Sequence, residues 1–358
     1  MRVTVVPEGD WKELTDEQLG GYRENTVCIV RYGGLGDSIQ ASSLFPLFKE
    51  RGLNICVNVT ENGVDMLRSD PNVDELLVQA DGQIPNDDLG PYIERLKLLF
   101  SDLVNTNGVV EGSLLCLPTH INYGSGLFDA DHETRHKALN KNYAEAMHDR
   151  AGLPYKFKTH FYTTSSERKW VKQQKKRMKI GPHNFLIVIT LSGSAVHKAY
   201  PHMDTVISRI LLKWPESRIV LMGDYFCKLL EAGWEDEPRV FLTSGEWPIR
   251  KSIAFAQQAD VVVGPETGVL NAIGMDRVNK VCLLSHSSEE NLTKHWLDAI
   301  SLSPTGVECF PCHKLHINGF KTCNRDEETG GSMCSAKIDP SDVMTAIESG
   351  KVKYRKTA

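Results

Sequence analysis

The chain has 358 residues, enough for two domains of ordinary size, and its 41% hydrophobic and 24% charged residues are typical of a globular protein. Its formal net charge of −5 excludes a general attraction to nucleic acid or acidic membranes, although a local basic face is compatible with it. No apolar segment approaches the ~20 residues of a membrane-spanning helix, and the N-terminus lacks a basic-then-apolar signal pattern. A cytoplasmic location is therefore expected.

In the first half of the chain, strand-like apolar runs alternate with helix-like patterns. Because this alternation builds parallel sheets covered on both faces, it predicts an α/β fold. Strands are predicted at Val27–Arg31, Ile55–Val59, Leu76–Val78 and Leu114–Leu117. Apolar residues at helical spacing predict a helix over Tyr92–Val104.

The second half repeats this alternation after a charged helix that ends at Gly181-Pro182. The predicted strands are Phe185–Leu191, Arg218–Met222, Val240–Leu242, Asp260–Val263 and Lys280–Leu284, and the predicted helices are Met203–Trp214, Ile249–Ala259 and Pro340–Ser349. Two successive α/β units predict two facing Rossmann-like domains with a cleft between them. The expected boundaries are 1–165 for the first domain, 166–182 for a linking helix, 183–339 for the second domain and 340–358 for a final helix and tail.

A glycine-rich turn that ends in a carboxylate follows the first of these strands. It contains Gly33, Gly34, Gly36 and Asp37. Ligands bind at the carboxyl ends of parallel strands, where glycines let the backbone approach a substrate closely, and Asp37 is a candidate proton acceptor there. The alternative is a tight turn in which Asp37 caps the next helix.

The loop after the strand at 185–191 has the composition of a diphosphate site. Hydroxyls of Ser192 and Ser194, together with backbone N–H groups, would hold phosphate oxygens, and the ammonium of Lys198 would offset their charge. The alternative is a polar loop with a surface lysine.

Two further loops follow strands of the second half. Asp224 comes after the strand at 218–222, where a carboxylate can accept hydrogen bonds from ribose hydroxyls or a base amine, or can cap a helix. Glu266, Thr267 and Gly268 follow the strand at 260–263 and open a helix. The N–H groups of that helix suit a phosphate, whereas Glu266 suits a sugar hydroxyl.

Four segments in this order resemble glycosyltransferase family 9, the ADP-heptose:lipopolysaccharide heptosyltransferases. Arg31–Asp37 is similar to the family's opening strand and Gly-Asp turn, and Ser192–Pro201 to its nucleotide-phosphate loop with Lys-x-x-Pro. Ala259–Gly268 resembles its Ala-Asp-x-x-Val-Gly-x-(Asp/Glu)-Thr-Gly signature, and Leu283–Trp296 the strand and loop that follow. The resemblance covers most of the chain.

The resemblance implies a GT-B fold, with two facing Rossmann-like domains and an interdomain cleft, and an inverting transfer of a sugar from a nucleotide-diphosphate donor to a hydroxyl. ADP-heptose is the favoured donor. Asp37 would be the general base on an acceptor-side loop formed by Gly33, Gly34 and Gly36. The implied donor-binding residues are Ser192, Ser194, Lys198, Asp224, Glu266, Thr267 and Gly268. No catalytic metal is implied, because Lys198 and a helix N-terminus can neutralise the diphosphate.

The chain departs from the family pattern in two places. Asn271 stands where the family commonly has a histidine three residues after its Thr-Gly, and Gly33-Gly34 replaces a turn that is often richer in Ser and Thr. The first departure removes one possible phosphate donor and weakens the assignment of the sugar more than that of the fold.

A cysteine-rich loop at 309–334 carries Cys309, Cys312, Cys323 and Cys334. Four thiolates suit a tetrahedral zinc or iron ion, and a disulfide set is disfavoured in a cytosolic protein. A similar motif occurs in the autotransporter heptosyltransferases, a branch of the same family in which the metal is iron. A structural iron or zinc is therefore expected here.

Several functions stay open on the sequence alone. The acceptor could be lipopolysaccharide core, a protein hydroxyl, or hydroxylated DNA bases in a phage-type enzyme, and the acidic net charge disfavours DNA. A nucleotide-sugar epimerase would need further acid/base residues near Asp37, and no convincing second carboxylate is present there. A non-catalytic GT-B-like binding protein would not need Asp37. An oligomer is compatible with the sequence.

Overall fold

The computed structural model describes residues 1–110, 126–193 and 195–357. The chain divides into two compact units, each with its own sheet and core. Unit 1 comprises Met1–Ser113 and Tyr143–Tyr162, and unit 2 comprises Leu114–Asn142 and Thr163–Ala358. The strand predicted at Leu114–Leu117 lies outside the described residues.

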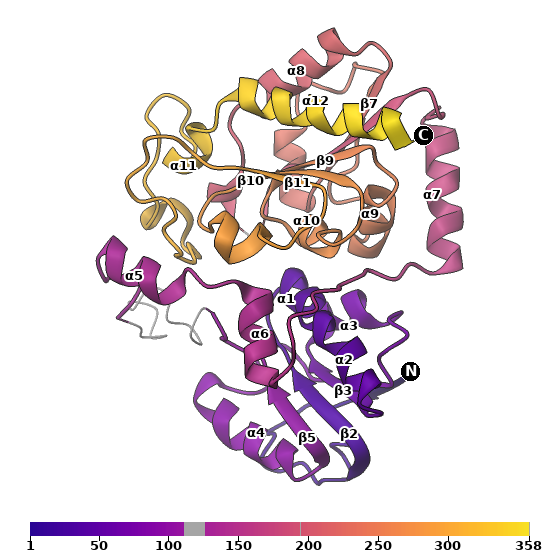
Figure 1. The fold of residues 1–358 in the computed structure, drawn as a ribbon, viewed down its shortest axis with the longest axis vertical. Coiled ribbons are helices and arrows are strands. Elements are labelled where there is room, and N and C mark those ends of the chain that lie inside the picture. The colour runs from indigo at the N-terminus through magenta and orange to yellow at the C-terminus, as the bar shows by residue number, and fades with distance from the viewer. Residues whose placement is uncertain (111–125, 194, 358) are drawn as a thin grey trace. The chain divides into compact units, whose positions relative to one another are not determined.

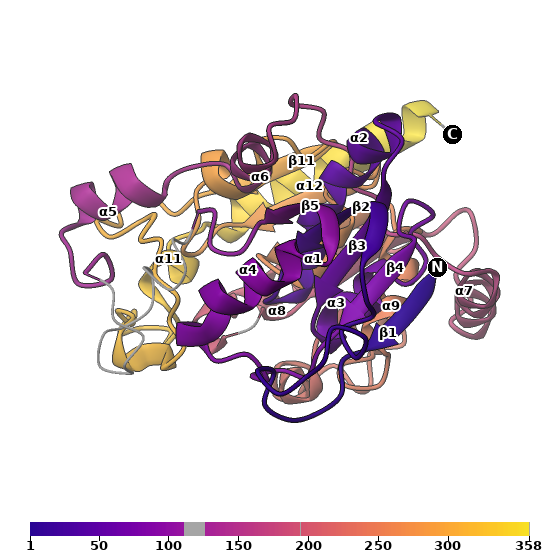
Figure 2. The same cartoon turned by 90° about the horizontal axis from the view of Figure 1, so that it is seen from below.

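Unit 1 contains a five-stranded parallel sheet in the order β1-β4-β3-β2-β5 (Figure 2). Its strands are β1 (Arg2–Val5), β2 (Arg23–Val30), β3 (Asn54–Val59), β4 (Glu75–Val78) and β5 (Phe100–Asn105). Its helices are α1 (Leu35–Ala41), α2 (Phe45–Glu50), α3 (Glu61–Leu67), α4 (Leu89–Lys97) and α6 (Tyr143–Ala151). The run Val27–Val30 is fully buried between neighbours on both sides, which explains its unbroken apolar sequence.

The helix predicted over Tyr92–Val104 is wrong in its second half. Helix α4 ends at Lys97, and Phe100–Asn105 forms strand β5, which pairs with β2. The apolar residues of this stretch fit helical spacing, but β2 has an edge that only another strand can satisfy with backbone hydrogen bonds. Tertiary pairing therefore overrides the local pattern.

Unit 2 contains a six-stranded parallel sheet in the order β11-β10-β9-β6-β7-β8. Its strands are β6 (Phe185–Thr190), β7 (Ser217–Met222), β8 (Val240–Leu242), β9 (Val261–Pro265), β10 (Asn279–Leu283) and β11 (Ala299–Leu302). Its helices are α5 (His132–Leu139), α7 (Ser165–Arg177), α8 (Met203–Lys213), α9 (Ile249–Ala256), α10 (Gly268–Ala272), α11 (Met333–Ala336) and α12 (Pro340–Thr357). If the strands β6 to β11 are numbered 1 to 6 along the chain, their order across the sheet from β8 to β11 is 3-2-1-4-5-6. This is the strand order of dinucleotide-binding sheets.

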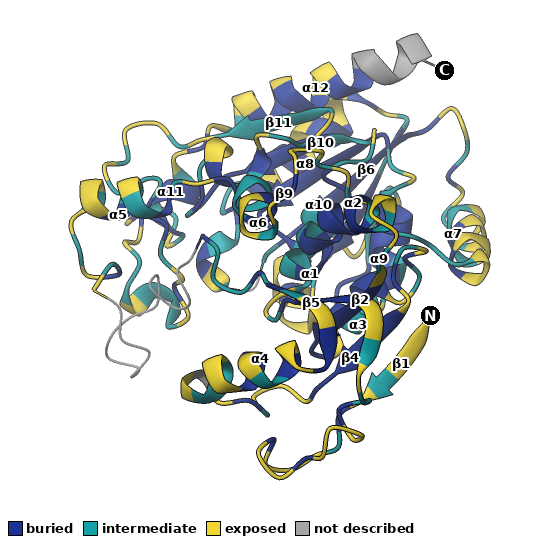
Figure 3. Ribbon diagram, turned by 60° about the horizontal axis from the view of Figure 1, so that its bottom comes forward, coloured by how far each residue is buried: buried dark blue, intermediate teal, exposed yellow. Residues whose placement is uncertain are grey.

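The core of unit 2 lies between the sheet and the helices α8 and α12. The two helices contact each other, and α12 also contacts β9 and β10 (Figure 1). Their apolar sides contribute Ile207 and Ile347, both fully buried, while the opposite side of each described helical turn is exposed (Figure 3). None of the described helices combines the length and apolar character that crossing a bilayer would need.

Each sheet has one point at which the strand order reverses. In unit 1 the chain builds β3 on one side of β2 and later β5 on the other, and in unit 2 it builds β7 on one side of β6 and later β9 on the other. Connections leave such a point in opposite directions, so the loops there diverge and leave a crevice in which ligands bind. The topology therefore directs attention to the loops after β2, β6 and β9.

The division of the chain differs from the expected boundary at residue 165. The described segment 126–142, which precedes α6 in the sequence, packs with unit 2. The side chain of Arg135 on α5 donates to the carbonyl of Cys312 at 2.6 Å, and the amide of Asn291 donates to the carbonyl of Lys141 at 2.7 Å. These contacts join residues over 140 positions apart, so no local sequence pattern predicts them.

A buried ion pair joins helix α7 to helix α9 within unit 2. Glu167, which forms a capping box with Thr164 at the start of α7, accepts from Arg250 of α9 at 2.6 and 3.0 Å. Arg250 is 2% exposed. Burial alone would raise the pKa of Glu167, but the Arg250 and Thr164 hydrogen bonds lower it to about 2.

We predict that Arg250→Met lowers the free energy of unfolding by about 3–5 kcal/mol, because it leaves the carboxylate of Glu167 buried without its charge partner. Since the folded-state pKa of Glu167 lies below its ordinary value of 4.5, its contribution is complete above that value and is lost as the pH falls toward 2. Urea titrations at several pH values measure both effects. Glu167→Gln should remove this part of the pH dependence.

The matched control is Lys228→Met, which removes one partner of the exposed Lys228–Glu246 pair, whose atoms are 3.9 Å apart. An Arg250→Met loss no larger than that of the control would contradict the prediction.

Candidate functional site

The turn after β2 presents a partly exposed carboxylate. Gly33 has a φ of +110°, and a Cβ at this position would come within 2.8 Å of Oδ2 of Asp37, so glycine is required. Oδ2 accepts from the backbone N–H of Gly34 at 2.7 Å, and Oδ1 forms an ion pair with Arg31. Asp37 therefore caps α1, as the alternative held, yet its side chain remains 31% exposed and accessible to a substrate.

Arg31 holds the carboxylate of Asp37 in position. It is 1% exposed, and its second nitrogen donates to the carbonyl of Thr106, at the end of β5, at 2.6 Å. The two strands on either side of the reversal point of unit 1 thus hold Asp37 in place. Gly34 is the N-cap residue of α1, and Gly36 lies in the first turn of this helix.

In unit 2, the loop after β6 carries Lys198 to the loop after β9. Nζ of Lys198 lies 3.4 Å from the carbonyl oxygen and 3.7 Å from Oε2 of Glu266, and the lysine side chain is 11% exposed. It is not a surface lysine. A Cβ at Gly193 would lie 2.8 Å from the Glu266 carbonyl and 2.7 Å from Cδ of Lys198, so this close approach requires glycine.

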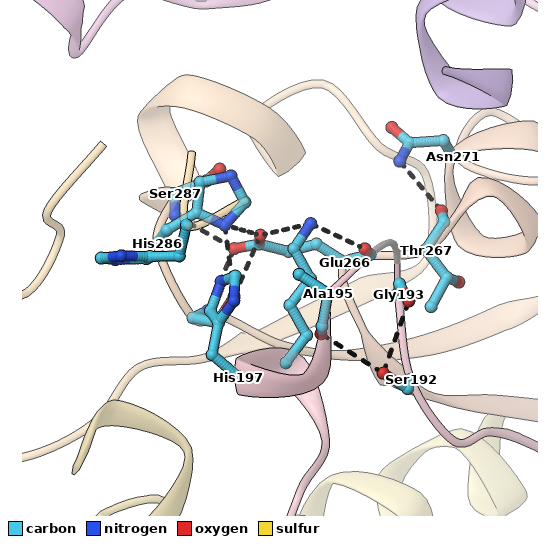
Figure 4. Close-up of polar contacts among 12 residues, drawn as sticks. Ser192, Gly193, Ala195, His197, Glu266, Thr267, Asn271, His286 and Ser287 are labelled. Carbon is cyan, nitrogen blue, oxygen red and sulfur yellow. Dashed lines mark hydrogen bonds and ion pairs between the residues drawn. The ribbon is translucent and has the colours of Figure 1, made fainter. Parts of the chain in front are cut away.

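Glu266 is the centre of the unit 2 site. Its carboxylate accepts from the backbone N–H groups of Ser285 and Ser287 at 3.0 and 3.1 Å and from the Ser285 hydroxyl at 3.1 Å. Nδ1 of His286 lies 2.6 Å from Oε2. Figure 4 shows His197 and His286 on one side of Glu266 and Thr267 and Asn271 on the other.

Neighbouring groups stabilise the ionised form of the Glu266 carboxylate. Burial alone would raise its pKa, but the attraction and hydrogen bond of His286, followed by Lys198 and the Ser285 N–H, hold the pKa well below the ordinary value of 4.5. Both oxygens are occupied by protein donors. The geometry therefore favours Glu266 as the residue that positions Lys198 and the 285–287 turn, rather than as a group directed at a sugar hydroxyl.

The remaining predicted donor-site residues follow β7 and β9, the two strands that flank β6. The carboxylate of Asp224 accepts from the N–H of Cys227 at 3.1 Å and caps a short turn, although Asp224 is exposed. Thr267 caps α10 by accepting from the N–H of Leu270 at 3.2 Å, and Gly268 begins that helix. The amide of Asn271 donates to the Thr267 carbonyl at 2.9 Å.

Of the two serines predicted to bind the donor, the structure describes only Ser192. The hydroxyl of Ser192 lies 3.4 Å from the carbonyl oxygens of Gly193 and Ala195 (Figure 4). Ser194 lies outside the described residues.

A cavity of about 100 Å³ lies next to this site within unit 2. All four cysteines of the 309–334 loop line it, and all four are free thiols. The other polar lining residues are Arg135, His197, Ser285, His286, Lys314, His316, Thr322 and Asn324. The sequence identified the cysteines correctly as one cluster but did not indicate that the cluster adjoins the Glu266 network.

Three histidines connect the cavity to the Glu266 network, and the sequence analysis assigned a role to none of them. The ring of His197 lies 4.8 Å from that of His316 and 6.1 Å from that of His286, between centroids. His197 is 2% exposed, makes no hydrogen bond through either ring nitrogen within the described part of the chain, and has a pKa that burial lowers to about 3. The only sequence signal was His197 standing next to Lys198.

The donor set of the cavity fits a thiophilic metal ion. Burial raises the pKa of Cys312 and of Cys323 to about 12, so these groups need a cation nearby to become thiolates. Across the described ranges, however, no three His, Cys, Asp or Glu side chains are arranged closely enough to hold a metal as they stand. The four cysteines share one cavity, and metal binding would require them to move closer together.

Comparisons with known proteins give fold relatives but no sequence relatives. No protein-family model matches the chain, and no curated protein matches it. Among solved structures, a glycosyl transferase family 9 protein from Veillonella parvula is 15% identical, with a TM-score of 0.65, covering 93% of this chain and 98% of that one. The ADP-heptose LPS heptosyltransferase II of E. coli is 13% identical, with a TM-score of 0.60, covering 92% of this chain and 99% of that one.

A third similar structure contains iron. It is the dodecameric iron-containing heptosyltransferase TibC of enterotoxigenic E. coli, in complex with ADP-D-β-D-heptose. It is 12% identical, with a TM-score of 0.57, covering 94% of this chain and 80% of that one. These similarities establish the fold: the chain has the two-sheet α/β architecture of the GT-B heptosyltransferases, as the motif resemblance implied.

We predict that Glu266→Gln lowers the free energy of unfolding by about 1–3 kcal/mol. The carboxylate of Glu266 accepts hydrogen bonds from N–H groups of the 285–287 turn. A glutamine has only one oxygen that can accept them, so its NH₂ group would face a donor and a buried donor would lose its partner. Chemical denaturation measures the loss. Glu289→Gln, at an exposed glutamate four residues from Ser285, is the control, and equal stabilities of the two variants would disprove the assigned role.

Proposed function

We propose that this protein is a glycosyltransferase of the family 9 type, which transfers a sugar from a nucleotide-diphosphate donor to a hydroxyl acceptor with inversion. One observation carries the proposal: Lys198 and the loop of Glu266 meet at the reversal point of a 3-2-1-4-5-6 sheet, in a fold shared with heptosyltransferases. In such sheets this is the position at which nucleotide phosphates bind.

For the donor we propose ADP-heptose. TibC was crystallised with ADP-D-β-D-heptose, and that structure is similar to this chain over most of its length. In the proposed complex, Lys198 neutralises the diphosphate, the backbone of Gly193, Thr267 and Gly268 approaches its oxygens, and Asp224 accepts from the nucleoside. Preorganised donors of this kind stabilise the charge that develops on the leaving diphosphate.

For the acceptor side we propose Asp37 as the general base. Its carboxylate takes the proton from the acceptor hydroxyl as the hydroxyl oxygen attacks the anomeric carbon and the bond to the diphosphate breaks. Direct displacement from the opposite face inverts the anomeric centre. Support comes from the partial exposure of Asp37 and from the ion pair with Arg31, which holds the carboxylate in a fixed orientation.

The acceptor is proposed as a lipopolysaccharide core sugar, in keeping with the LPS heptosyltransferase of similar fold, or as a protein hydroxyl, which the resemblance of the four-cysteine motif implies. A cytoplasmic location and self-association belong to the same proposal. TibC is dodecameric, and this chain exposes Tyr225, Phe226 and Leu229 side by side on one short turn, at 70%, 78% and 81%. Exposed apolar clusters of this kind are typical of protein interfaces.

We also propose that Cys309, Cys312, Cys323 and Cys334 bind a structural iron or zinc ion. The support is their convergence on one cavity, the absence of disulfides among them, and the iron of TibC. When bound, the ion would hold the thiolates together and fold the loop. The displacement reaction does not need it.

We predict that Lys198→Met raises the Kd for ADP about ten- to a hundredfold, because a charge-assisted contact to the diphosphate is lost. Isothermal titration calorimetry measures the affinity. Lys213→Met removes an exposed lysine of the same unit, paired with Glu348 at 2.8 Å, and should bind ADP like the wild type. Unchanged affinity in Lys198→Met would exclude this lysine from the diphosphate site.

We predict that Asp37→Asn lowers the rate of sugar transfer about 10²- to 10⁴-fold while ADP affinity stays the same, because only the proton acceptor is lost. The rate of ADP release from ADP-heptose is measured with heptose-free lipopolysaccharide and with unmodified protein as acceptors. Asp81→Asn, at an exposed aspartate of unit 1, is the control.

Wild-type turnover in Asp37→Asn would remove the general base from the proposal. Tight ADP binding with no turnover on any acceptor would instead favour a binding protein of GT-B fold.

We predict that the purified protein carries about one equivalent of iron or zinc, and that Cys312→Ser and Cys334→Ser lose most of it. Elemental analysis measures the content. Cys227→Ala, at a buried thiol outside the loop, should retain the metal. Equal metal content in all three variants would rule out the cysteine site.

A further inference from the structure

The cysteine loop contacts the segment that carries Lys198. The hydroxyl of Ser332, two residues from Cys334, donates to the carbonyl of His197 at 2.7 Å, and the Ser335 hydroxyl lies 3.4 Å from the same oxygen. Ser332 is fully buried and also caps α11, the helix that contains Cys334. The backbone next to Lys198 is thus tied directly to the helix that carries one of the four thiols.

Further contacts hold the rest of this segment to the end of the loop. Nε2 of His202 lies 3.0 Å from the Ala336 carbonyl, and the Tyr200 hydroxyl donates to the Ile338 carbonyl at 2.8 Å. A Cβ at Gly331 would lie 3.0 Å from Cγ of Pro201, so the proline ring packs closely against the backbone of Gly331. The segment 197–202 therefore lies against residues 331–338 over its whole length.

The same loop also touches the opposite wall of the candidate diphosphate site. The N–H of His313, next to Cys312, donates to the carbonyl of His286 at 2.9 Å. The ring of His286 contacts the carboxylate of Glu266, which in turn contacts Lys198. Both walls of the site are thus connected to residues adjacent to cysteines, one through Ser332 and the other through His313.

We propose that the cysteine loop is a positioning element for the diphosphate site, and that metal binding in its cavity raises the affinity of Lys198 and its neighbours for a nucleoside diphosphate. The key contact is the one between Ser332 and the His197 carbonyl. This inference rests on the proposed function and adds to it a coupling between two sites. Ser332 and His197 are positioning residues, since neither needs to touch the donor.

The physical basis is that the cysteine loop would be more ordered with a metal bound than without one. Without a metal, no bond joins the four sulfur atoms, so the loop has more freedom to move, and the segment 197–202, which is hydrogen-bonded to it, shares that freedom. With a metal, the thiolates draw together and fix α11, Ser332 and hence the backbone of Lys198. A site that is already ordered binds its ligand more tightly, and by linkage the nucleotide raises the affinity for the metal by the same factor.

The experiment uses the full-length protein and two readouts: amide hydrogen exchange of the segment 196–202, and ADP titration calorimetry. Ser332→Ala removes the hydroxyl and keeps all four thiols, while Ser332→Thr restores a hydroxyl. Ser42→Ala is the matched control, because Ser42 is a buried serine of unit 1 that donates to a backbone carbonyl at 2.6 Å. Each protein is measured after chelation and after addition of Zn²⁺ alone.

The expected result is faster exchange in 196–202 and a three- to tenfold higher Kd for ADP in Ser332→Ala, with Ser332→Thr close to the wild type and Ser42→Ala unchanged in both readouts. Zn²⁺ should slow this exchange in the wild type and do so less in Ser332→Ala. Equal exchange and equal ADP affinity in Ser332→Ala and Ser42→Ala would overturn the proposal, as would a wild type in which Zn²⁺ changes neither readout.

Two outcomes separate this inference from the proposed function. If the wild type does not bind ADP but Ser332→Ala and Zn²⁺ still change the exchange of 196–202, the donor site is wrong and the positioning by the loop stands. If ADP binds and neither variant nor metal affects it, the donor site stands and the coupling is wrong. If Ser332→Ala does not fold, Ser335→Ala, which keeps the cap of α11, provides the same readouts with a smaller expected effect.

Discussion

The carboxylate of Glu266 is the interaction on which the unit 2 site depends. It is almost completely buried, and it is ionised only because His286, Lys198 and the N–H groups of the 285–287 turn surround it. A buried charge of this kind fixes the positions of its partners, since each partner that moves away leaves an expensive unpaired group. The loops after β6, β9 and β10 are therefore held together by one side chain, at the point where the sheet order reverses.

The carboxylate of Asp37 in unit 1 differs from that of Glu266 in its burial. Its carboxylate is held on one side by Arg31 and on the other by a backbone N–H, but it remains partly exposed. A positioned but accessible carboxylate suits proton transfer, whereas the enclosed carboxylate of Glu266 suits the positioning of other groups. The two acidic residues thus differ in burial: Asp37 is partly exposed, whereas Glu266 is enclosed by its partners.

Much of the fold followed from the sequence. Apolar runs with no alternation predicted the central strands β2, β6, β7 and β9, because strands buried on both faces need apolar residues at every position. The edge strands β1 and β11 were missed, since short strands that are not buried on both faces lack a long apolar run, and β5 was taken for a helix. Segment 126–142 could not be assigned to unit 2, because its contacts are with residues far along the chain.

The sequence by itself determined the residue types at the site: the glycines and carboxylate after β2, the lysine after β6, the Glu-Thr-Gly after β9 and the four cysteines. Their order and spacing carry chemistry that is local, so it is readable without a structure. Only the tertiary structure decided that Glu266 accepts from the 285–287 turn, and that His197 and Ser332 place the cysteine loop against Lys198. These contacts join segments that the sheet order brings together, and strand order is a property of the whole chain that no short stretch of sequence contains.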